Sequence, residues 1–224
     1  MIDTDILLSN LVSRVRALPV RPEPHVRLLT YNEPVALAVD EVLSGAGAAC
    51  LTLTLPDDID EALSLIENVL PGADLLVIVA DASAPIRDAL DVIAELVRAT
   101  GLFEPGGDTA WGLLSGVPVI VLPSERYEAL IATHIVAVPA VRARAGAAPM
   151  FRTPRAVTVS GAVVGAPRVR RFVPGRSSLV DPSVVAPMNE VRSLEAADVL
   201  LVIPDSADVR SGDTVAAVPL RGDW

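Results

Sequence analysis

The stretch LLVIVADASAPIRDAL, residues 75–90, decides the fold of this chain. It opens with five apolar residues, 75–79, a run typical of a strand buried on both faces. Small residues follow, and Pro85 is placed to occupy the first turn of a helix. A buried strand that passes through a short turn into a helix indicates a parallel α/β sheet, and ligands bind at this end of such strands. The stretch therefore predicts both a fold class and the place of a site.

Outward from this stretch, residues 26–143 alternate between apolar runs and helical spacing. The apolar runs predict strands at 26–31, 49–55 and 74–80. Helices are predicted from Pro34, from Pro56 and from Pro85 to Thr100, each with proline near its start. Residues 110–123 predict a hairpin around a glycine turn. This order predicts a sheet with helices on both faces, in three layers.

Two further helices follow from the same rules. Residues 124–146 predict a long helix capped by Ser124, ended at Gly146 and kinked at Pro139. Residues 3–17 have Ile6, Leu7, Leu11 and Val15 at helical spacing, with Thr4 or Asp5 as a cap. A segment with three prolines ends this first helix.

The chain changes character near residue 149. Residues 1–149 hold 20 acidic residues and 9 arginines, a net charge of −11, whereas residues 150–224 hold 8 and 9, a net charge of +1. The later part alternates at period two, as strands do. We therefore expect an N-terminal helix and linker at 1–26, an α/β domain at 27–148 and a small all-β domain at 149–224.

Composition excludes several function classes. The net charge is −10 and the chain contains no lysine, which argues against a nucleic-acid binder and against a basic helix at a membrane surface. A single cysteine, Cys50, excludes a disulfide within the chain, and only two histidines are present to build a zinc site. The first residues are acidic, unlike a signal peptide, so we expect a cytoplasmic protein.

Several segments resemble one known family, the molybdopterin molybdenumtransferases, which include the MoeA proteins and the gephyrin E domain. The segment ADLLVIVADASAPIRDA, 73–89, is similar to the family's strand and GGVS turn. The segment from Phe103 to Gly146 follows the family's pattern from KPGKP through GLPGNP to the helix after it, almost without gaps. The resemblance covers about residues 27–224.

The resemblance implies an architecture and a chemistry. Its fold would be a three-layer α/β/α molybdopterin-binding domain of the MogA type, followed by a small all-β barrel-like domain. Members of the family form homodimers, and they carry two further N-terminal domains that have no counterpart here, where only residues 1–26 precede the matching region. The sequence leaves open whether a separate chain supplies those domains. The family's enzyme inserts molybdate into adenylylated molybdopterin, with magnesium.

The motifs that would bind the pterin phosphate are altered. Ala80 and Asp81 replace the two glycines of the GGVS turn, while Ser83 keeps its serine and Asp88 falls on a family aspartate. The resemblance also implies these further changes: Ser124, Glu125 and Arg126 replace the Gly-Asn-Pro core, and Glu104 and Gly107 replace two lysines. Glycine turns and lysines favour a phosphate, whereas carboxylates repel it.

The candidate site residues follow from these positions. The cofactor-binding candidates are Asp81, Ser83, Ser124 and Glu125. Glu33 and Asp88 are the catalytic and metal-binding candidates, because carboxylates hold magnesium beside phosphate oxygens.

Three interpretations stay open at this point. The first is a degenerate member of the family, a pseudoenzyme that acts as a binding or assembly scaffold without a cofactor. The alternative is an active molybdopterin molybdenumtransferase with magnesium and molybdopterin. The third is an unrelated use of the fold, such as a nucleotide or sugar-acid site. We expect a homodimer, a protein partner from molybdenum cofactor assembly, and neither nucleic acid nor membrane as a partner.

Overall fold

The computed structural model describes residue 11, residues 13–188, residue 194 and residues 196–221. The chain divides into two compact units. Unit 1 comprises Met1–Thr100 and Gly106–Met150, and unit 2 comprises Gly101–Pro105 and Phe151–Trp224. Each unit has its own hydrophobic core.

Unit 1 is built on a six-stranded sheet in the order β2-β1-β3-β7-β6-β4. The first four strands are parallel, and β6 and β4 are antiparallel to their neighbours. The strands are β1 (His25–Thr30), β2 (Ala49–Thr54), β3 (Leu75–Val79), β4 (Val97–Arg98), β6 (Ala110–Leu114) and β7 (Val117–Leu122). The strands and the hairpin predicted from the apolar runs are confirmed.

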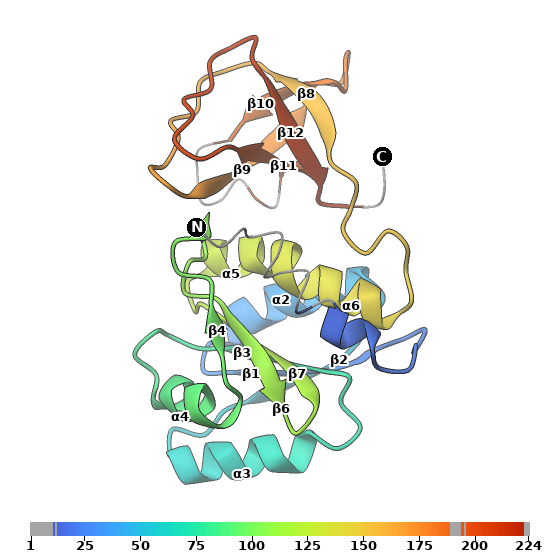
Figure 1. The fold of residues 1–224 in the computed structure, drawn as a ribbon, viewed down its shortest axis with the longest axis vertical. Coiled ribbons are helices and arrows are strands. Elements are labelled where there is room, and N and C mark those ends of the chain that lie inside the picture. Colours follow the sequence, from blue (N-terminus) through green and yellow to red (C-terminus); the bar gives the residue numbers. More distant parts are fainter. Residues whose placement is uncertain (1–10, 12, 189–193, 195, 222–224) are drawn as a thin grey trace. The chain divides into compact units, whose positions relative to one another are not determined.

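Helices cover both faces of this sheet, which gives the three expected layers (Figure 1). On one face lie α2 (Glu33–Gly45), α5 (Arg126–Ala132) and α6 (Val138–Arg144). On the other face lie α3 (Ile59–Val69) and α4 (Pro85–Ile93). The chain begins α3 after Asp58, which caps it, and thus three residues later than the predicted start at Pro56.

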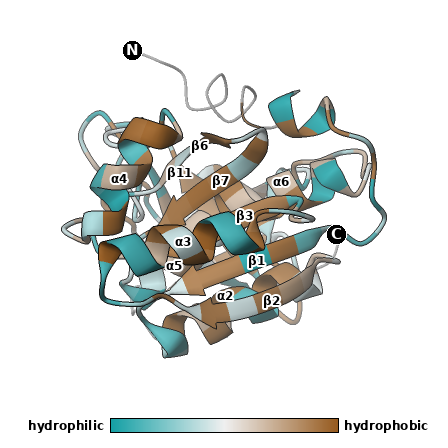
Figure 2. Ribbon diagram, turned by 90° about the horizontal axis from the view of Figure 1, so that it is seen from below, coloured by the Kyte–Doolittle hydropathy of each residue, from teal (hydrophilic) through white to brown (hydrophobic). Residues whose placement is uncertain are grey.

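The middle of the sheet is apolar on both faces because both are covered. Every residue of β3 is buried. Leu76 and Ile78 pack with Ile66 of α3 and Leu90 of α4, and the central strands are hydrophobic along their length (Figure 2). Full burial of each such side chain contributes about 1.5–3 kcal/mol, so this core dominates the stability of unit 1.

The helix predicted over Pro85–Thr100 is wrong in its second half. It ends at Ile93, and Glu95 has a φ of 46°, in the left-handed region that no helix continues through. Val97 and Arg98 then form β4, which pairs with Trp111 and Ala110. Strand pairing with a segment further along the chain therefore overrides the local helical spacing.

The predicted long helix after β7 is interrupted. A five-residue π-helical turn, Thr133–Ala137, separates α5 from α6 and ends beside Pro139. Proline has no N–H to donate to the preceding turn, and a widened turn accommodates its ring. An irregularity near Pro139 is thus confirmed. The predicted cap at Ser124 is wrong, because the side chain of Glu125 caps α5.

Unit 2 is a closed barrel of five strands, with β5 (Phe103–Glu104) added at its side. The strand order is β10-β8-β12-β11-β9-β5, and a further pairing of β10 with β9 closes the ring. The five barrel strands are β8 (Arg155–Val159), β9 (Arg170–Ser177), β10 (Val184–Pro187), β11 (Val199–Ile203) and β12 (Thr214–Pro219). Its core consists of inward-facing valine, leucine, isoleucine and alanine side chains, as the period-two pattern predicted.

The short strand β5 belongs to unit 2 although it lies between segments of unit 1 in the sequence. It pairs in parallel with Arg170 and Arg171 of β9. Phe103 is fully buried there, and its ring meets that of Phe172 edge to face, with centroids 6.0 Å apart. The sequence pattern did not predict this strand.

The N-terminal prediction falls largely outside the described residues. Residues 13–16 are helical, and Leu11 and Val15 are each 2% exposed, as expected for the apolar side of a helix. Ile6, Leu7 and both cap candidates lie outside the described residues. Within the part of the chain that the structure describes, no helix is both long and apolar enough to cross a membrane.

Candidate functional site

The candidate site lies at the carboxyl ends of β1, β3 and β7. These parallel strands are adjacent in the sheet, so the segments that follow them meet at one edge. The chain leaves β1 for α2 on one face and leaves β3 for α4 on the other face. Such a divergence of neighbouring connections is where open α/β sheets bind ligands. The relevant segments are residues 31–33, 80–88 and 123–125.

Asn32 organises the segment after β1. Its backbone N–H donates to the Thr30 hydroxyl at 2.7 Å, and its side-chain oxygen accepts from the N–H of Val35 at 3.4 Å, which caps α2. Its side-chain amide donates to the carbonyl of Ser124 at 3.3 Å. Asn32 therefore joins the end of β1 to the end of β7. Asn32 was not among the residues predicted from the sequence, although asparagine just before a helix with proline in its first turn is a known cap signal.

Two of the predicted site residues contact each other. The hydroxyl of Ser124, after β7, donates a hydrogen bond to the carboxylate of Asp81, after β3. The neighbouring Glu125 is exposed and its carboxylate accepts from the N–H of Glu128 at 2.9 Å, at the start of α5. The turns after β3 and β7 thus present carboxylates at the edge of the sheet where a phosphate-binding site would instead present backbone N–H groups to the anion.

The other three predicted residues are exposed around the same edge. Glu33 is the first residue of α2, Ser83 lies in the turn before α4, and Asp88 lies in the first turn of α4. An acidic residue in a first helical turn complements the helix dipole without any ligand. Among the described residues, no group of three or more His, Cys, Asp or Glu side chains is arranged to hold a metal ion. Magnesium bound partly through substrate phosphates would need fewer protein ligands, so the metal assignment stays a prediction.

A buried arginine supports the turn after β3. Arg87 is 1% exposed, and it donates to the carbonyl of Ala80 at 2.9 Å and to the carbonyl of Asp108. Burial lowers the pKa of its guanidinium, and the carboxylates of Asp108 and Asp81 oppose that shift. The buried cation therefore holds the turn in place from below and lies within electrostatic range of Asp81. Its burial could not be read from the sequence, which shows an arginine at an ordinary helical position.

Tyr31 adds a neutral donor to this edge. Its phenol is partly buried at the end of β1, and burial raises its pKa, with the charge of Asp57 acting in the same direction. Around neutral pH the phenol therefore keeps its proton.

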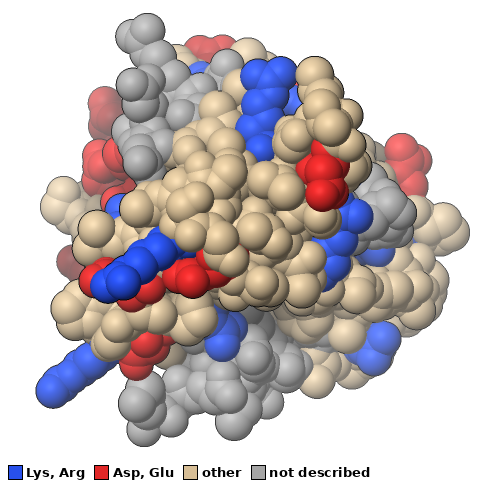
Figure 3. Space-filling view, turned by 90° about the horizontal axis from the view of Figure 1, so that it is seen from above, with Lys and Arg blue, Asp and Glu red and all other residues tan. Residues whose placement is uncertain are grey.

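Three arginines of unit 2 donate to backbone carbonyls of that unit. Arg152 donates to the carbonyl of Pro219 at 2.8 Å, Arg155 to that of Pro182 at 3.2 Å, and Arg171 to that of Val164 at 2.6 Å. On the face of the molecule drawn in Figure 3, arginines are interspersed with acidic side chains and other residues. These contacts support a structural role for the three arginines.

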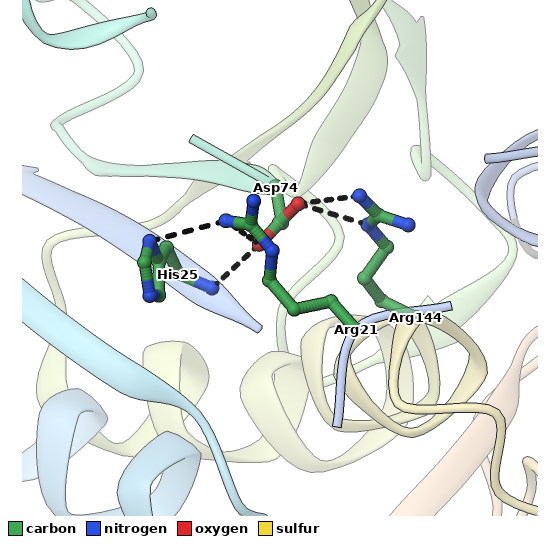
Figure 4. Close-up of polar contacts among 4 residues, drawn as sticks. All are labelled: Arg21, His25, Asp74 and Arg144. Carbon is green, nitrogen blue, oxygen red and sulfur yellow. Dashed lines mark hydrogen bonds and ion pairs between the residues drawn. The ribbon is translucent and has the colours of Figure 1, made fainter. Parts of the chain in front are cut away.

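A buried ionic cluster lies at the opposite, amino end of the sheet (Figure 4). Asp74, just before β3, is 4% exposed. It accepts from the N–H of His25 at 2.8 Å, from Arg21 at 3.0 Å and from Arg144 at 2.5 and 3.1 Å. Burial alone would raise the pKa of Asp74, but these hydrogen bonds and the two arginine charges lower it below its ordinary value. The cluster ties the segment before β1 to α6 and is structural.

Comparison with known proteins bears on the fold. No family model and no curated protein matches the sequence. A solved MoeA molybdopterin biosynthesis protein from Pyrococcus horikoshii is 19% identical, with a TM-score of 0.74 over 90% of this chain and 55% of that one. A second structure of a MoeA protein from this organism is 15% identical, with a TM-score of 0.70 over 90% of this chain and 55% of that one.

A molybdenum cofactor biosynthesis protein from Pyrococcus furiosus is 15% identical, with a TM-score of 0.72 over 88% of this chain and 68% of that one. The chain therefore spans about half the length of the MoeA structures and two thirds of the third protein. At sequence identities of 15–19%, these comparisons show that the three-dimensional fold is similar. The chain has the fold of part of the MoeA molybdopterin biosynthesis proteins, as its motifs implied.

Proposed function

We propose that this is a MoeA-like protein of molybdenum cofactor biosynthesis that has lost catalytic activity and serves as a binding or assembly scaffold. It would act in the cytoplasm as a homodimer, with a protein partner from the same assembly pathway. The fold and the sequence motifs support the relation to MoeA. The side chains at the carboxyl edge of the sheet support the loss of activity.

The observation that carries this proposal is the bond between Asp81 and Ser124. It joins the two turns that would have to cradle a phosphate, and Glu125 places a second carboxylate beside them. A unit negative charge about 4 Å from another costs about 1 kcal/mol in water and about 4 kcal/mol at an effective dielectric constant of 20. Two such carboxylates would weaken the binding of a pterin phosphate substantially.

The alternative is an active molybdopterin molybdenumtransferase. It is favoured by the position of Glu33 and Asp88 in the first turns of helices that begin at the same edge of the sheet. In that case their carboxylates would hold magnesium between the protein and the substrate phosphate. Arg87 would supply positive charge beneath the turn.

Calorimetry with adenylylated molybdopterin, with and without magnesium, separates the two. The scaffold proposal expects no binding by the natural chain at up to about 100 µM ligand; a dissociation constant of about 100 µM corresponds to a binding free energy of only about −5.5 kcal/mol. The double variant Asp81→Gly and Glu125→Asn removes both carboxylates and should gain affinity. The control Asp60→Asn removes a carboxylate from the start of α3 and should gain none.

Magnesium-dependent binding in the micromolar range by the natural chain, together with insertion of molybdate in vitro, would establish the enzyme instead. Restored cofactor synthesis in a strain that lacks its transferase would have the same meaning. Lack of binding by the natural chain combined with a gain in the double variant supports the scaffold.

A further inference from the structure

The turn between β9 and β10 in unit 2, residues 178–183, presents two apolar side chains to water. Leu179 is 97% exposed and Val180 is 96% exposed. No other large apolar side chain among the described residues is as exposed as these two. Isolated exposed apolar residues are ordinary on protein surfaces, whereas contiguous ones point to an interaction site. The adjacent pair on this turn is therefore a candidate contact for another molecule.

Hydrogen bonds within the turn fix its conformation. The hydroxyl of Ser178 accepts from the N–H of Val180 at 3.2 Å. The carboxylate of Asp181 accepts from the N–H of Ser183 at 2.9 Å and from its hydroxyl at 2.6 Å. The N–H of Ser178 donates to the carbonyl of Val184 at 2.8 Å, and the N–H of Val184 donates to that of Asp181 at 3.0 Å. The polar groups of the turn thus bond to one another, while its apolar side chains face outward.

Strand β8 holds the turn on the barrel. The N–H of Thr158 donates to the carbonyl of Ser183 at 2.7 Å, and the guanidinium of Arg155 donates to the carbonyl of Pro182 at 3.2 Å. A turn that is already ordered loses little conformational entropy when a partner binds it, which raises the affinity. The two apolar side chains are therefore held ready for binding.

An arginine that is free to pair with another molecule lies next to the turn. Arg176, in β9, is exposed, and its side chain makes no hydrogen bond or ion pair with any of the described residues. It precedes Leu179 by three residues, so the two Cα atoms are no more than about 11 Å apart. By contrast, the carboxylates of Asp181 and Asp198 accept hydrogen bonds from backbone N–H groups of the turn and of β9. A free cation beside an apolar contact is complementary to a carboxylate at the rim of a pocket.

We infer that this turn docks a protein partner, which receives Leu179 and Val180 in an apolar pocket and pairs Arg176 with an Asp or Glu at the rim. Apolar anchors that fill a pocket carry most of the binding energy of such interfaces. A membrane is a weaker candidate, because two side chains bury less apolar surface than a single myristoyl chain, which alone gives only marginal binding. The inference rests on the proposed protein partner, and it holds whether or not the carboxyl edge of the sheet in unit 1 binds a pterin.

Photo-cross-linking from the turn identifies the partner. The full chain is expressed in cells of its source organism with p-benzoylphenylalanine in place of Leu179. The control carries the same amino acid in place of Val164, which is 70% exposed elsewhere in unit 2. A protein that is cross-linked from position 179 and not from position 164 is then purified, and its affinity for the natural chain is measured by calorimetry.

Three variants of the full chain test the contact with that purified protein. Replacing both Leu179 and Val180 by serine should weaken binding at least about 30-fold, as the loss of a hot spot does. Arg176→Glu should weaken it roughly tenfold, mainly through slower association at low salt. Asp181→Ala keeps the apolar side chains but frees the turn, and it should cost about three- to tenfold. The control Val164→Ser should bind as the natural chain does.

Circular dichroism should show that each variant is folded. The inference is overturned if position 179 gives no cross-link beyond that of the control, or if it cross-links only to lipid or to a second copy of this chain. A complex that neither the double serine variant nor Arg176→Glu weakens also overturns it. The double serine variant should match the natural chain in calorimetry with adenylylated molybdopterin, so a failure of this inference leaves the proposed loss of activity untouched.

Discussion

At the scale of single residues, Asp74 shows how one buried carboxylate can organise a domain. It joins the segment before β1 to the last turn of α6 through Arg21, Arg144 and the N–H of His25 (Figure 4). Removing one partner of a buried ion pair leaves the other charges uncompensated and costs about 3–5 kcal/mol. We expect Asp74→Asn to lower the free energy of unfolding by this amount in urea titrations. The matched control is Asp91→Asn, which breaks a more exposed ion pair with Arg98 and should cost less than about 1 kcal/mol.

The same carboxylate predicts a dependence of stability on pH. Its pKa is lower in the folded chain than the ordinary value of 3.8. The unfolded chain therefore binds a proton first as the pH falls, and the contribution of Asp74 is complete above about pH 4 and is lost below it as the pH approaches the folded pKa. The natural chain should lose stability across this range more steeply than Asp74→Asn. Parallel curves for the two proteins would show that Asp74 does not carry this effect.

Cys50 allows a third prediction at this scale. Burial raises the pKa of its thiol to about 11, with the Asp40 carboxylate acting in the same direction and the Ser44 hydroxyl opposing it. Because the thiolate is the reactive form, alkylation at pH 8 should be roughly 100-fold slower than that of an ordinary cysteine. The rate should recover in urea and rise in Asp40→Asn. Equal rates for the folded and unfolded chain would contradict the assignment.

At the scale of elements, the contact between α4 and β6 depends on a glycine. A Cβ at Gly112 would overlap the carbonyl oxygen of Ala94, at the end of α4. That carbonyl accepts from the N–H of Leu113 at 3.2 Å, so the strand cannot move away without losing the bond. We expect Gly112→Ala to destabilise unit 1 by about 1–3 kcal/mol, as overpacking does.

A second glycine gives the control for this substitution. A Cβ added at Gly45, the last residue of α2, would have no atom within 4 Å, and the φ of this residue is not in the left-handed region. Gly45→Ala should therefore be neutral or stabilise the chain by up to about 1 kcal/mol. If both substitutions have the same effect in denaturant titrations, the close approach at Gly112 is not what matters.

The same elements show what local sequence can predict. Apolar runs located five of the six strands of the sheet, most clearly β3, because a strand buried on both faces needs apolar residues at every position. The end of α4 was missed, since β4 is defined by its pairing with Trp111 and not by its own spacing. Ser124 is a good cap by type, but its hydroxyl bonds to Asp81 after another strand, and Glu125 takes the cap instead. The residues chosen for the candidate site thus lie at the strand ends, whereas their contacts depend on residues distant in sequence, and their role in binding stays a prediction.

At the scale of the whole molecule, the chain enters unit 2 briefly before it completes unit 1. The segment Gly101–Pro105 supplies β5 to the side of β9, and Phe103 is fully buried against Phe172. Burying a phenylalanine contributes about 3–5 kcal/mol relative to alanine. We therefore expect Phe103→Ala to destabilise unit 2 by this amount, although the rest of that unit begins only at Phe151.

Hydrogen exchange can assign this loss to the correct unit. In Phe103→Ala the amides of β9 and β11 should exchange faster, whereas those of β1 and β3 should be unchanged, because each unit has its own core. The control Ile86→Ala, in the core of unit 1, should give the opposite pattern. Faster exchange throughout the chain in both variants would mean that the two units unfold as one cooperative body, and the stability of the barrel could not then be separated from that of the sheet.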